Sequence, residues 1–191
     1  AEIAFSAYAR SFFFERAELG AATTRAGNVI GGGDWAVDRI IPDCIRAINS
    51  DKPIHLRNPV ATRPWQHVLE PLSGYLLLAV RLYENPRDYE GAWNFGPPSS
   101  EVRTVLQVAE HIVERYGKGT VTSDVVEKKH HEAQLLQLNC DKAHQILNWY
   151  PRWSVEHTLD MTSDWYKKVL NGESAEDVTR QQLHEYFPEL L

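Results

Sequence analysis

The stretch GNVIGGGDWAVDRIIPD, residues 27–43, places three consecutive glycines between a hydrophobic run and the start of a helical pattern. Residues 21–30 are predicted to form a strand whose end lacks strict alternation, as in a strand covered on both faces. Residues 40–50 are predicted to form a helix, with Pro42 near its first turn and isoleucines on one face. A strand, a glycine turn and a helix in this order are typical of layered α/β proteins.

The rest of the sequence continues this alternation. Helices are expected at 1–18, 71–84, 104–117, 141–147, 154–172 and 174–186, and extended segments at 52–56, 65–68, 92–95, 120–126 and 135–138. Thr104 and Gln107 have the spacing of a capping box, and Asp141, Ser154 and Ser174 can cap the later helices. The first helix is apolar on nearly all sides, which predicts that more than one neighbour buries it.

Composition narrows the class of protein. The 191 residues are 43% hydrophobic and 24% charged, with a net charge of −6, which argues against sequence-independent nucleic-acid binding. Cys44 and Cys140 have no C-x-x-C spacing, so we expect reduced, cytosolic thiols. No apolar run approaches the roughly 20 residues of a membrane span. The sequence opens inside a helical pattern without an initiator Met, so we expect a piece of a longer protein.

The glycine cluster has two interpretations. Neither G-x-G-x-x-G nor G-x-x-x-x-G-K-[ST] occurs, so the cluster is a weak phosphate signal. It can form a turn that needs positive φ, or let the backbone approach a ligand at the carboxyl end of a strand. Asn28, just before that edge, could offer its amide to a ligand or make a local structural bond.

Arginines provide the candidate anion ligands. Arg63 precedes Pro64 and is therefore extended, so Arg63, Trp65 and His67 are expected on one side of the segment. An arginine beside an aromatic ring suits a diphosphate or a stacked ring, although a surface arginine in a turn is equally compatible. Arg39 stands at the start of a helix, where a solvated charge is the alternative. Arg25, inside a strand, is expected in a buried structural pair.

Catalytic and metal signatures are weak. His130, His131 and Glu132 are adjacent, so in an extended segment neighbours point to opposite faces, and no third ligand follows at a typical spacing. We therefore expect no metal site. The histidines on predicted helices are expected at the surface: His111, His144, His157 and His184. Neither G-x-S-x-G nor Tyr-x-x-x-Lys occurs, so no catalytic residue is predicted in this chain.

Several ordered motifs resemble one known family. RAGNVIGGGDWAVDRIIPD resembles the R-x-x-N-V-Y-G-P segment of the extended short-chain dehydrogenases/reductases, which are NAD(P)-dependent enzymes of nucleotide sugars. TRPWQHV resembles their R-D-[WFY]-x-[YH]-V motif, WNFGP their Y-N-[IVL]-G segment, and NCDKAHQILNWYP their closing D-x-x-K-A-x-x-x-L-G-W-x-P. Within the family, GGGDWA and HHEAQLLQL are most similar to 4,6-dehydratases of cytidine-diphosphate sugars. Another nucleotide-sugar dehydratase, a 4-epimerase, or a binding module without catalysis are the alternatives.

This resemblance implies a division of the chain. Residues 1–30 would end an NAD-binding Rossmann-type doubly wound sheet, and 31–191 would form a smaller mixed α/β substrate-binding domain, with 65–95 partly returning to the sheet. The glycine loop for NAD and the catalytic Tyr-x-x-x-Lys would lie upstream of Ala1. The first helix would belong to a four-helix bundle in a homodimer or higher oligomer.

The resemblance also assigns binding roles. The residues implied to bind the nucleotide sugar are Asn28, Arg39, His55, Arg63, His131 and Glu132. Asn28 would contact the sugar diphosphate near the nicotinamide of NAD, and Arg63 the diphosphate. Arg39 would lie near the phosphates or hexose, residues 54–56 beside the nucleobase, and His131 and Glu132 near the ribose.

Two residues depart from the family pattern. Pro64 replaces the usual Asp and alters local hydrogen bonding while keeping Arg63. Asn148 replaces the usual Gly before Trp149, and Asn tolerates the left-handed conformation that the Gly would take.

Overall fold

The computed structural model describes residues 1–13, 15–16, 18–123 and 138–190. These residues divide into two compact units. The first unit comprises Ala1–Ala26, Glu70–Gly96 and Leu138–Pro151, and the second comprises the described parts of 27–69, 97–137 and 152–191. Among the described residues, no helix is both long and apolar enough to cross a membrane.

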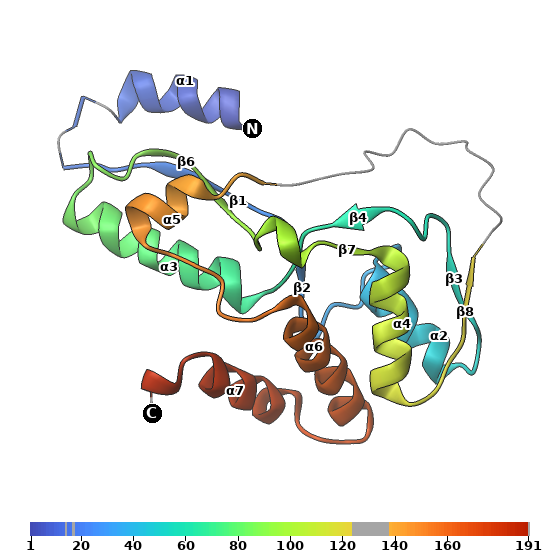
Figure 1. Ribbon diagram of the computed structural model, residues 1–191. Helices are drawn as coiled ribbons and strands as arrows, with labels where there is room; N and C mark the ends of the chain where they lie inside the picture. Colours follow the sequence, from blue (N-terminus) through green and yellow to red (C-terminus); the bar gives the residue numbers. More distant parts are fainter. Residues whose placement is uncertain (14, 17, 124–137, 191) are drawn as a thin grey trace. The chain divides into compact units, whose positions relative to one another are not determined.

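The first unit is built on a parallel pair of strands (Figure 1). Strand β1 (Ala22–Ala26) pairs with β6 (Gly91–Phe95), and helices α3 (Leu69–Glu84) and α5 (Asp141–Leu147) lie beside them. The buried core of this unit consists of Leu78, Trp93, Phe95, Ala143, Leu147 and Trp149. A Cβ on Gly74 would lie 2.3 Å from Phe95 Cδ1, so this glycine allows α3 to approach β6 closely.

The second unit contains three short strand pairs. Parallel pairs join β2 (Asn28–Ile30) to β5 (Trp65–His67) and β3 (Ile54–Leu56) to β8 (Val121–Ser123). An antiparallel pair joins β4 (Thr62–Arg63) to β7 (Arg103–Thr104). The helices of this unit are α2 (Ile40–Asn49), α4 (Val105–Tyr116), α6 (Val155–Leu170) and α7 (Ala175–Tyr186), with short 3₁₀ turns at Ser99–Glu101 and Pro188–Leu190.

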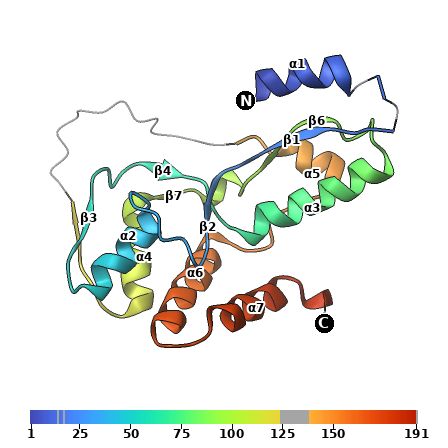
Figure 2. The same ribbon diagram turned by 180° about the vertical axis from the view of Figure 1, so that it is seen from behind.

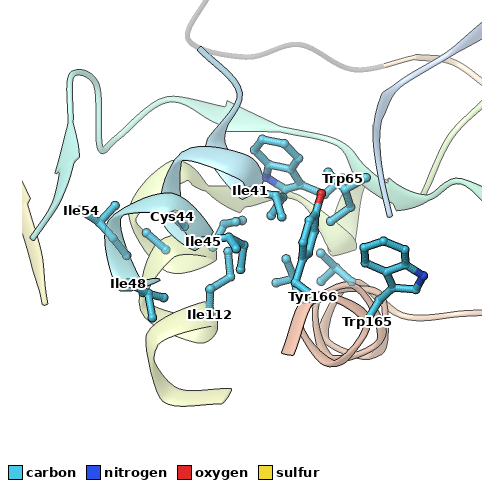
Figure 3. Packing of buried hydrophobic residues seen from close by; sticks show 14 of the residues in the cluster. Ile41, Cys44, Ile45, Ile48, Ile54, Trp65, Ile112, Trp165 and Tyr166 are labelled. Carbon is cyan, nitrogen blue, oxygen red and sulfur yellow. The ribbon is translucent and has the colours of Figure 1, made fainter. Parts of the chain in front are cut away.

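Side chains from α2, α4 and α6 form most of the core of the second unit, and β2, β3, β5 and α7 contribute the rest. Helix α2 lies against α4 in both views of the ribbon (Figures 1 and 2). Figure 3 shows Ile41, Ile45 and Ile48 of α2 facing Ile112 of α4, with Tyr166 of α6 projecting toward them. The isoleucine face predicted for residues 40–50 is therefore the face that α2 buries. The prediction of an α/β protein with parallel strands is confirmed.

Helix ends follow the capping residues in the sequence. Thr104 Oγ1 accepts from Gln107 N while the Gln107 side chain accepts from Thr104 N, so the predicted capping box is confirmed. Ser154 and Ser174 also cap their helices. Asn148 ends α5 in the left-handed conformation, with φ of 53°. The cap predicted for Asp141 is wrong, because Cys140 occupies that position and Asn139 Oδ1 accepts from Asp141 N instead.

The strand predicted over residues 21–30 is interrupted at Gly27. Asn28 N donates to Pro64 O, and a Cβ on Gly27 would lie 2.8 Å from that same oxygen. The chain therefore changes partner at Gly27, from β6 to β5. In this chain β1 is not covered on both faces, since Thr24 and Arg25 are exposed. Arg25 is paired with Glu2 and Asn94, as predicted, but the pair is not buried.

The first helix is shorter and less covered than predicted. Helix α1 (Glu2–Phe12) gives way to turns in which Arg16 N donates to Phe13 O and Leu19 N to Arg16 O, so it does not continue to residue 18. Within this chain Ile3 is 89% exposed, so the neighbours expected to bury the helix are not among the described residues. The assignment of 1–30 and 31–191 to two functional domains stays a prediction.

Candidate functional site

The glycine loop, defined as residues 31–39, is packed against α6. A Cβ on Gly32 would lie 2.0 Å from Trp165 Cδ2, so the indole ring occupies the space of a side chain at this position. Trp165 is buried, and its Nε1 donates to Thr179 Oγ1 at 2.8 Å. Gly33 follows with φ of 86°, a conformation that favours glycine. The turn interpretation of these glycines is therefore supported, and close packing is an additional reason for them.

Tyr166, the next residue of α6, holds the middle of the same loop. Its hydroxyl donates to Asp34 O at 2.5 Å, and its ring meets the Trp35 ring edge-on at a centroid distance of 5.1 Å. Burial, with Asp34 nearby, raises the pKa of Tyr166 to about 12, so the phenol stays protonated and donates this bond at neutral pH. Figure 3 shows Trp165 and Tyr166 leaving α6 in different directions.

His67 lies beneath the start of the loop. A Cβ on Gly31 would lie 3.0 Å from Val68 Cγ1 and 3.7 Å from His67 Nε2. The His67 ring is buried, packs 4.8 Å from the Trp153 ring, and accepts a long 3.4 Å hydrogen bond from Leu69 N through Nδ1. Burial, reinforced by His157, lowers the pKa of His67 to about 4. His67 is therefore neutral at physiological pH.

A large cavity opens between the glycine loop, β3 and β4. Its volume is about 1670 Å³, above the ~300–1,000 Å³ of an ordinary ligand pocket, so it has room for a ligand with several parts. Every residue lining it belongs to the second unit. The glycine loop contributes backbone to its wall, as the ligand interpretation of the cluster requires.

Most of the predicted substrate ligands lie on the wall of this one cavity. Asn28 is at the start of β2, Arg39 directly precedes α2, His55 is on β3 and Arg63 is on β4. His131 and Glu132 lie outside the described residues. The structure therefore gathers residues that are 35 positions apart in sequence, from 28 to 63, and their binding roles stay predictions.

Trp65 also lines the cavity, beside Arg63, whereas His67 is not among the lining residues. Of the three residues predicted to lie on one side of this segment, Arg63 and Trp65 therefore share the cavity wall and His67 does not. The reason is that β5 is buried on both faces, which leaves His67 packed against Trp153.

The prediction that the four helical histidines are surface residues is correct only in part, because all four are half-buried. His111 Nε2 lies 2.8 Å from Asp160 Oδ1, which joins α4 to α6. His144 is half-buried and stacks on Tyr150 at a centroid distance of 4.7 Å. Both histidine rings therefore contact a neighbouring segment and stay partly exposed. No group of three potential metal ligands occurs among the residues that the structure describes.

Several charged residues of the cavity wall were not predicted from the sequence, and two of them form an ion pair. Arg57 follows β3 directly, and Asp38 lies in the glycine loop, with Arg57 Nη2 3.1 Å from Asp38 Oδ1. Arg39 Nε lies 3.6 Å from Asp34 Oδ2 on the same wall. Because Arg57 directly follows a predicted strand, the sequence could have indicated it as a candidate ligand. No pattern in the sequence predicts that it pairs with Asp38.

Comparison with known proteins finds a relative of nearly all of the chain. The chain is 41% identical over 98% of its length to CDP-glucose 4,6-dehydratase of Salmonella typhimurium and spans 53% of that protein. The chain is homologous to about half of a CDP-glucose 4,6-dehydratase. No protein-family profile matches the chain. The resemblance found in the sequence motifs is thus confirmed over nearly all of the present chain.

Solved structures show the same fold. A dTDP-glucose 4,6-dehydratase of Bacillus anthracis, in complex with NAD, superposes with a TM-score of 0.66 and 21% identity. The superposition covers 85% of the present chain and 47% of the dehydratase chain. A UDP-glucose 4-epimerase of Thermotoga maritima, with UDP-glucose, has a TM-score of 0.68 and 19% identity over 88% and 51% of the two chains. The present chain therefore has the fold of one half of nucleotide-sugar dehydratases and epimerases.

The contact between Gly32 and Trp165 yields a stability prediction. Gly32→Ala should lower the free energy of unfolding by about 1–3 kcal/mol, because the added methyl group overlaps the indole ring. Urea unfolding followed by circular dichroism measures the loss. In a double-mutant cycle with Trp165→Ala, the double variant should lose less than the sum of the single losses. Additive losses would show that the overlap is not the cause.

The burial of His67 yields a pH prediction. Its pKa is lower in the folded than in the unfolded protein, so its stabilisation is complete above about pH 6.5 and is lost as the pH falls toward about 4. Lowering the pH from 7 to 5 should cost about 2 kcal/mol of unfolding free energy through this group. In His67→Asn the pH dependence should shrink by that amount. An unchanged pH dependence in the variant would contradict the assignment.

Proposed function

We propose that this chain is the substrate-binding portion of a nucleotide-sugar 4,6-dehydratase, a hydro-lyase that converts CDP-D-glucose to CDP-4-keto-6-deoxy-D-glucose. The observation that carries the proposal is the 41% identity over 98% of the chain to CDP-glucose 4,6-dehydratase. The cavity in the second unit supports it, because the predicted substrate ligands that the structure describes share its wall. Because the chain spans about half of that relative, the complete activity is proposed for the whole enzyme.

When bound, NAD would supply the redox chemistry of the proposed reaction, in which hydride would leave C4 of the glucose and return to C6 after loss of water across C5–C6. This chain has no G-x-G-x-x-G loop for NAD and no Tyr-x-x-x-Lys, so its own contribution is to bind and orient the substrate. Asn28, half-buried on the cavity wall at the start of β2, fits a contact near the nicotinamide. We propose no catalytic residue within the chain, and we expect the chain alone to be inactive.

Arg63 and Arg39 are the proposed ligands of the diphosphate. Arginine suits this role because its planar guanidinium makes paired hydrogen bonds to phosphate oxygens. Arg63 is half-buried on β4, where its Nη1 donates to Thr62 O at 2.8 Å, which holds the guanidinium against the strand. A half-buried cation gains more from an anion than a fully solvated one, because water screens it less.

The nucleobase is proposed to lie beside β3. Ile54 and Leu56 are each 2% exposed, so they anchor the strand in the core, while His55 between them points outward and lines the cavity. His131 and Glu132 are proposed to approach the ribose. An exposed polar side chain between two buried residues is the arrangement in which a strand presents one residue to a ligand.

Oligomerisation is proposed to involve α1. The helix exposes Ile3 by 89%, and Tyr8 and Phe12 by 56% each, although all three side chains are apolar or aromatic. Exposed apolar side chains gathered on one helix mark a surface that another element covers. This supports a homodimer or higher oligomer formed through α1.

The second candidate is another nucleotide-sugar enzyme of the same fold, a 4,6-dehydratase for a different nucleotide or a 4-epimerase. It is favoured by the structural likeness to a UDP-glucose 4-epimerase, with a TM-score of 0.68. A sugar-nucleotide-binding module without catalysis is a third possibility. The candidates differ in the nucleotide that the cavity prefers and in whether the whole enzyme dehydrates its substrate.

Calorimetric titration of the 191-residue chain with CDP, UDP and dTDP tests the proposal. CDP should bind more tightly than the other two nucleotides, and Arg63→Gln should weaken CDP binding about tenfold through loss of a charge-assisted contact. Arg180→Gln is the matched control, since Arg180 is an exposed arginine paired with Glu176 outside the cavity. Equal affinities for the three nucleotides would remove the cytidine assignment, and absence of binding would contradict the proposal.

A further inference from the structure

One ion pair spans the wall of the cavity. Arg57 Nη2, directly after β3, lies 3.1 Å from Asp38 Oδ1 in the glycine loop, and both residues line the cavity. Their side chains are 75% and 78% exposed. An ion pair this exposed stabilises a protein little, because water screens the attraction and both side chains lose freedom. The pair is therefore a weak contact that a ligand anion could replace.

The backbone of Asp38 has an unusual conformation. Asp38 has φ of 62°, the left-handed region that Asp and Asn enter more readily than other non-glycine residues. The neighbouring Arg39 forms a similar, longer contact, with its Nε 3.6 Å from Asp34 Oδ2. Two carboxylates of the glycine loop thus each contact a guanidinium group on the cavity wall, one after β3 and one within the loop itself. In both cases the acceptor is an oxygen anion, the kind of group that a phosphate also offers.

We propose that Arg57 is an anion-binding residue of the cavity and that Asp38 occupies it in the unliganded protein, so that a ligand's diphosphate takes the place of Asp38. The inference rests on the proposed function, since it assumes that a nucleoside diphosphate enters this cavity. It adds a ligand contact that the sequence motifs do not assign.

This exchange makes the cavity selective for charge. A diphosphate offers Arg57 more negative charge and more acceptor oxygens than one carboxylate. It therefore displaces the Asp38 carboxylate from the guanidinium group. A nucleoside without phosphate cannot displace Asp38, and the pair stays closed beside it. A ligand therefore gains the contact with Arg57 only if it can displace Asp38, which a diphosphate can do and a neutral nucleoside cannot.

The test compares CDP with cytidine in calorimetric titrations of the 191-residue chain. Asp38→Asn removes the competing charge, and Asn accepts the same left-handed backbone, so CDP should bind about two- to fivefold more tightly. Arg57→Gln should weaken CDP binding about tenfold. Neither variant should change the affinity for cytidine. Circular dichroism checks that each variant is folded, and Asp38→Gly, which also accepts positive φ, serves if Asp38→Asn does not fold.

The chain offers a matched control pair outside the cavity. Asp51 also has positive φ, 50°, and its Oδ1 lies 3.6 Å from Lys118 Nζ in an exposed ion pair. Asp51→Asn and Lys118→Gln make the same changes of charge and should leave CDP affinity unchanged. The control separates exchange at Arg57 from a general effect of net charge or of backbone conformation.

The double variant decides between exchange and simple repulsion. If Asp38 competes for Arg57, Asp38→Asn should give no gain in CDP affinity once Arg57→Gln is present. A gain that persists in that background, or a wild-type affinity in both single variants, would overturn the exchange while leaving CDP binding intact. If the wild-type chain binds no nucleotide at all, the proposed function fails instead, and the exchange fails with it.

Discussion

The packing of Gly32 against Trp165 is the contact on which the geometry of the cavity depends. The indole ring of α6 fills the space where a side chain would start, so the glycine loop lies directly on the helix. The hydrogen bond from the Tyr166 hydroxyl to Asp34 O fixes the next part of the loop. From there the chain presents Asp38 and Arg39 to the cavity before α2 begins.

The helices transmit this position to the rest of the second unit. Helix α6 is tied to α4 by the contact of His111 with Asp160 and by the paired hydrogen bonds of Arg115 with Asp164, at 2.8 and 2.6 Å. Helix α4 in turn packs against the buried face of α2, where Ile45 and Ile48 are almost fully buried. The glycine loop, whose backbone lines the cavity, therefore packs on a buried hydrophobic core. Such support keeps ligand-binding residues in place at little entropic cost on binding.

The elements of the fold were predictable where local chemistry decides them. The capping box at Thr104, the serine caps and the isoleucine face of α2 follow from spacing alone, and the structure confirms them. The break at Gly27 was not predictable, because it depends on Pro64 O, a partner 37 positions later in the sequence. Likewise the need for glycine at position 32 comes from Trp165, which no local pattern connects to it.

The candidate site was predictable in its residue types and not in its pairing. The motifs pointed to Asn28, Arg39 and Arg63, and the structure places them on one cavity. The partnership of Arg57 with Asp38 arises because β3 and the glycine loop meet in space, and Asp38 takes a left-handed conformation that its sequence neighbours do not announce. His67 was expected on the same side of its segment as Arg63, but it is buried against Trp153 and does not line the cavity.

The central claim is that the cavity of the second unit binds a nucleoside diphosphate. Backbone amide NMR of the 191-residue chain during titration with CDP tests this claim most directly. We predict that the largest chemical-shift changes fall at residues 28–39 and 54–63, around the cavity wall, and that amides of β1 and β6 stay unchanged. Shift changes concentrated in the first unit, or absent from the glycine loop, would contradict it.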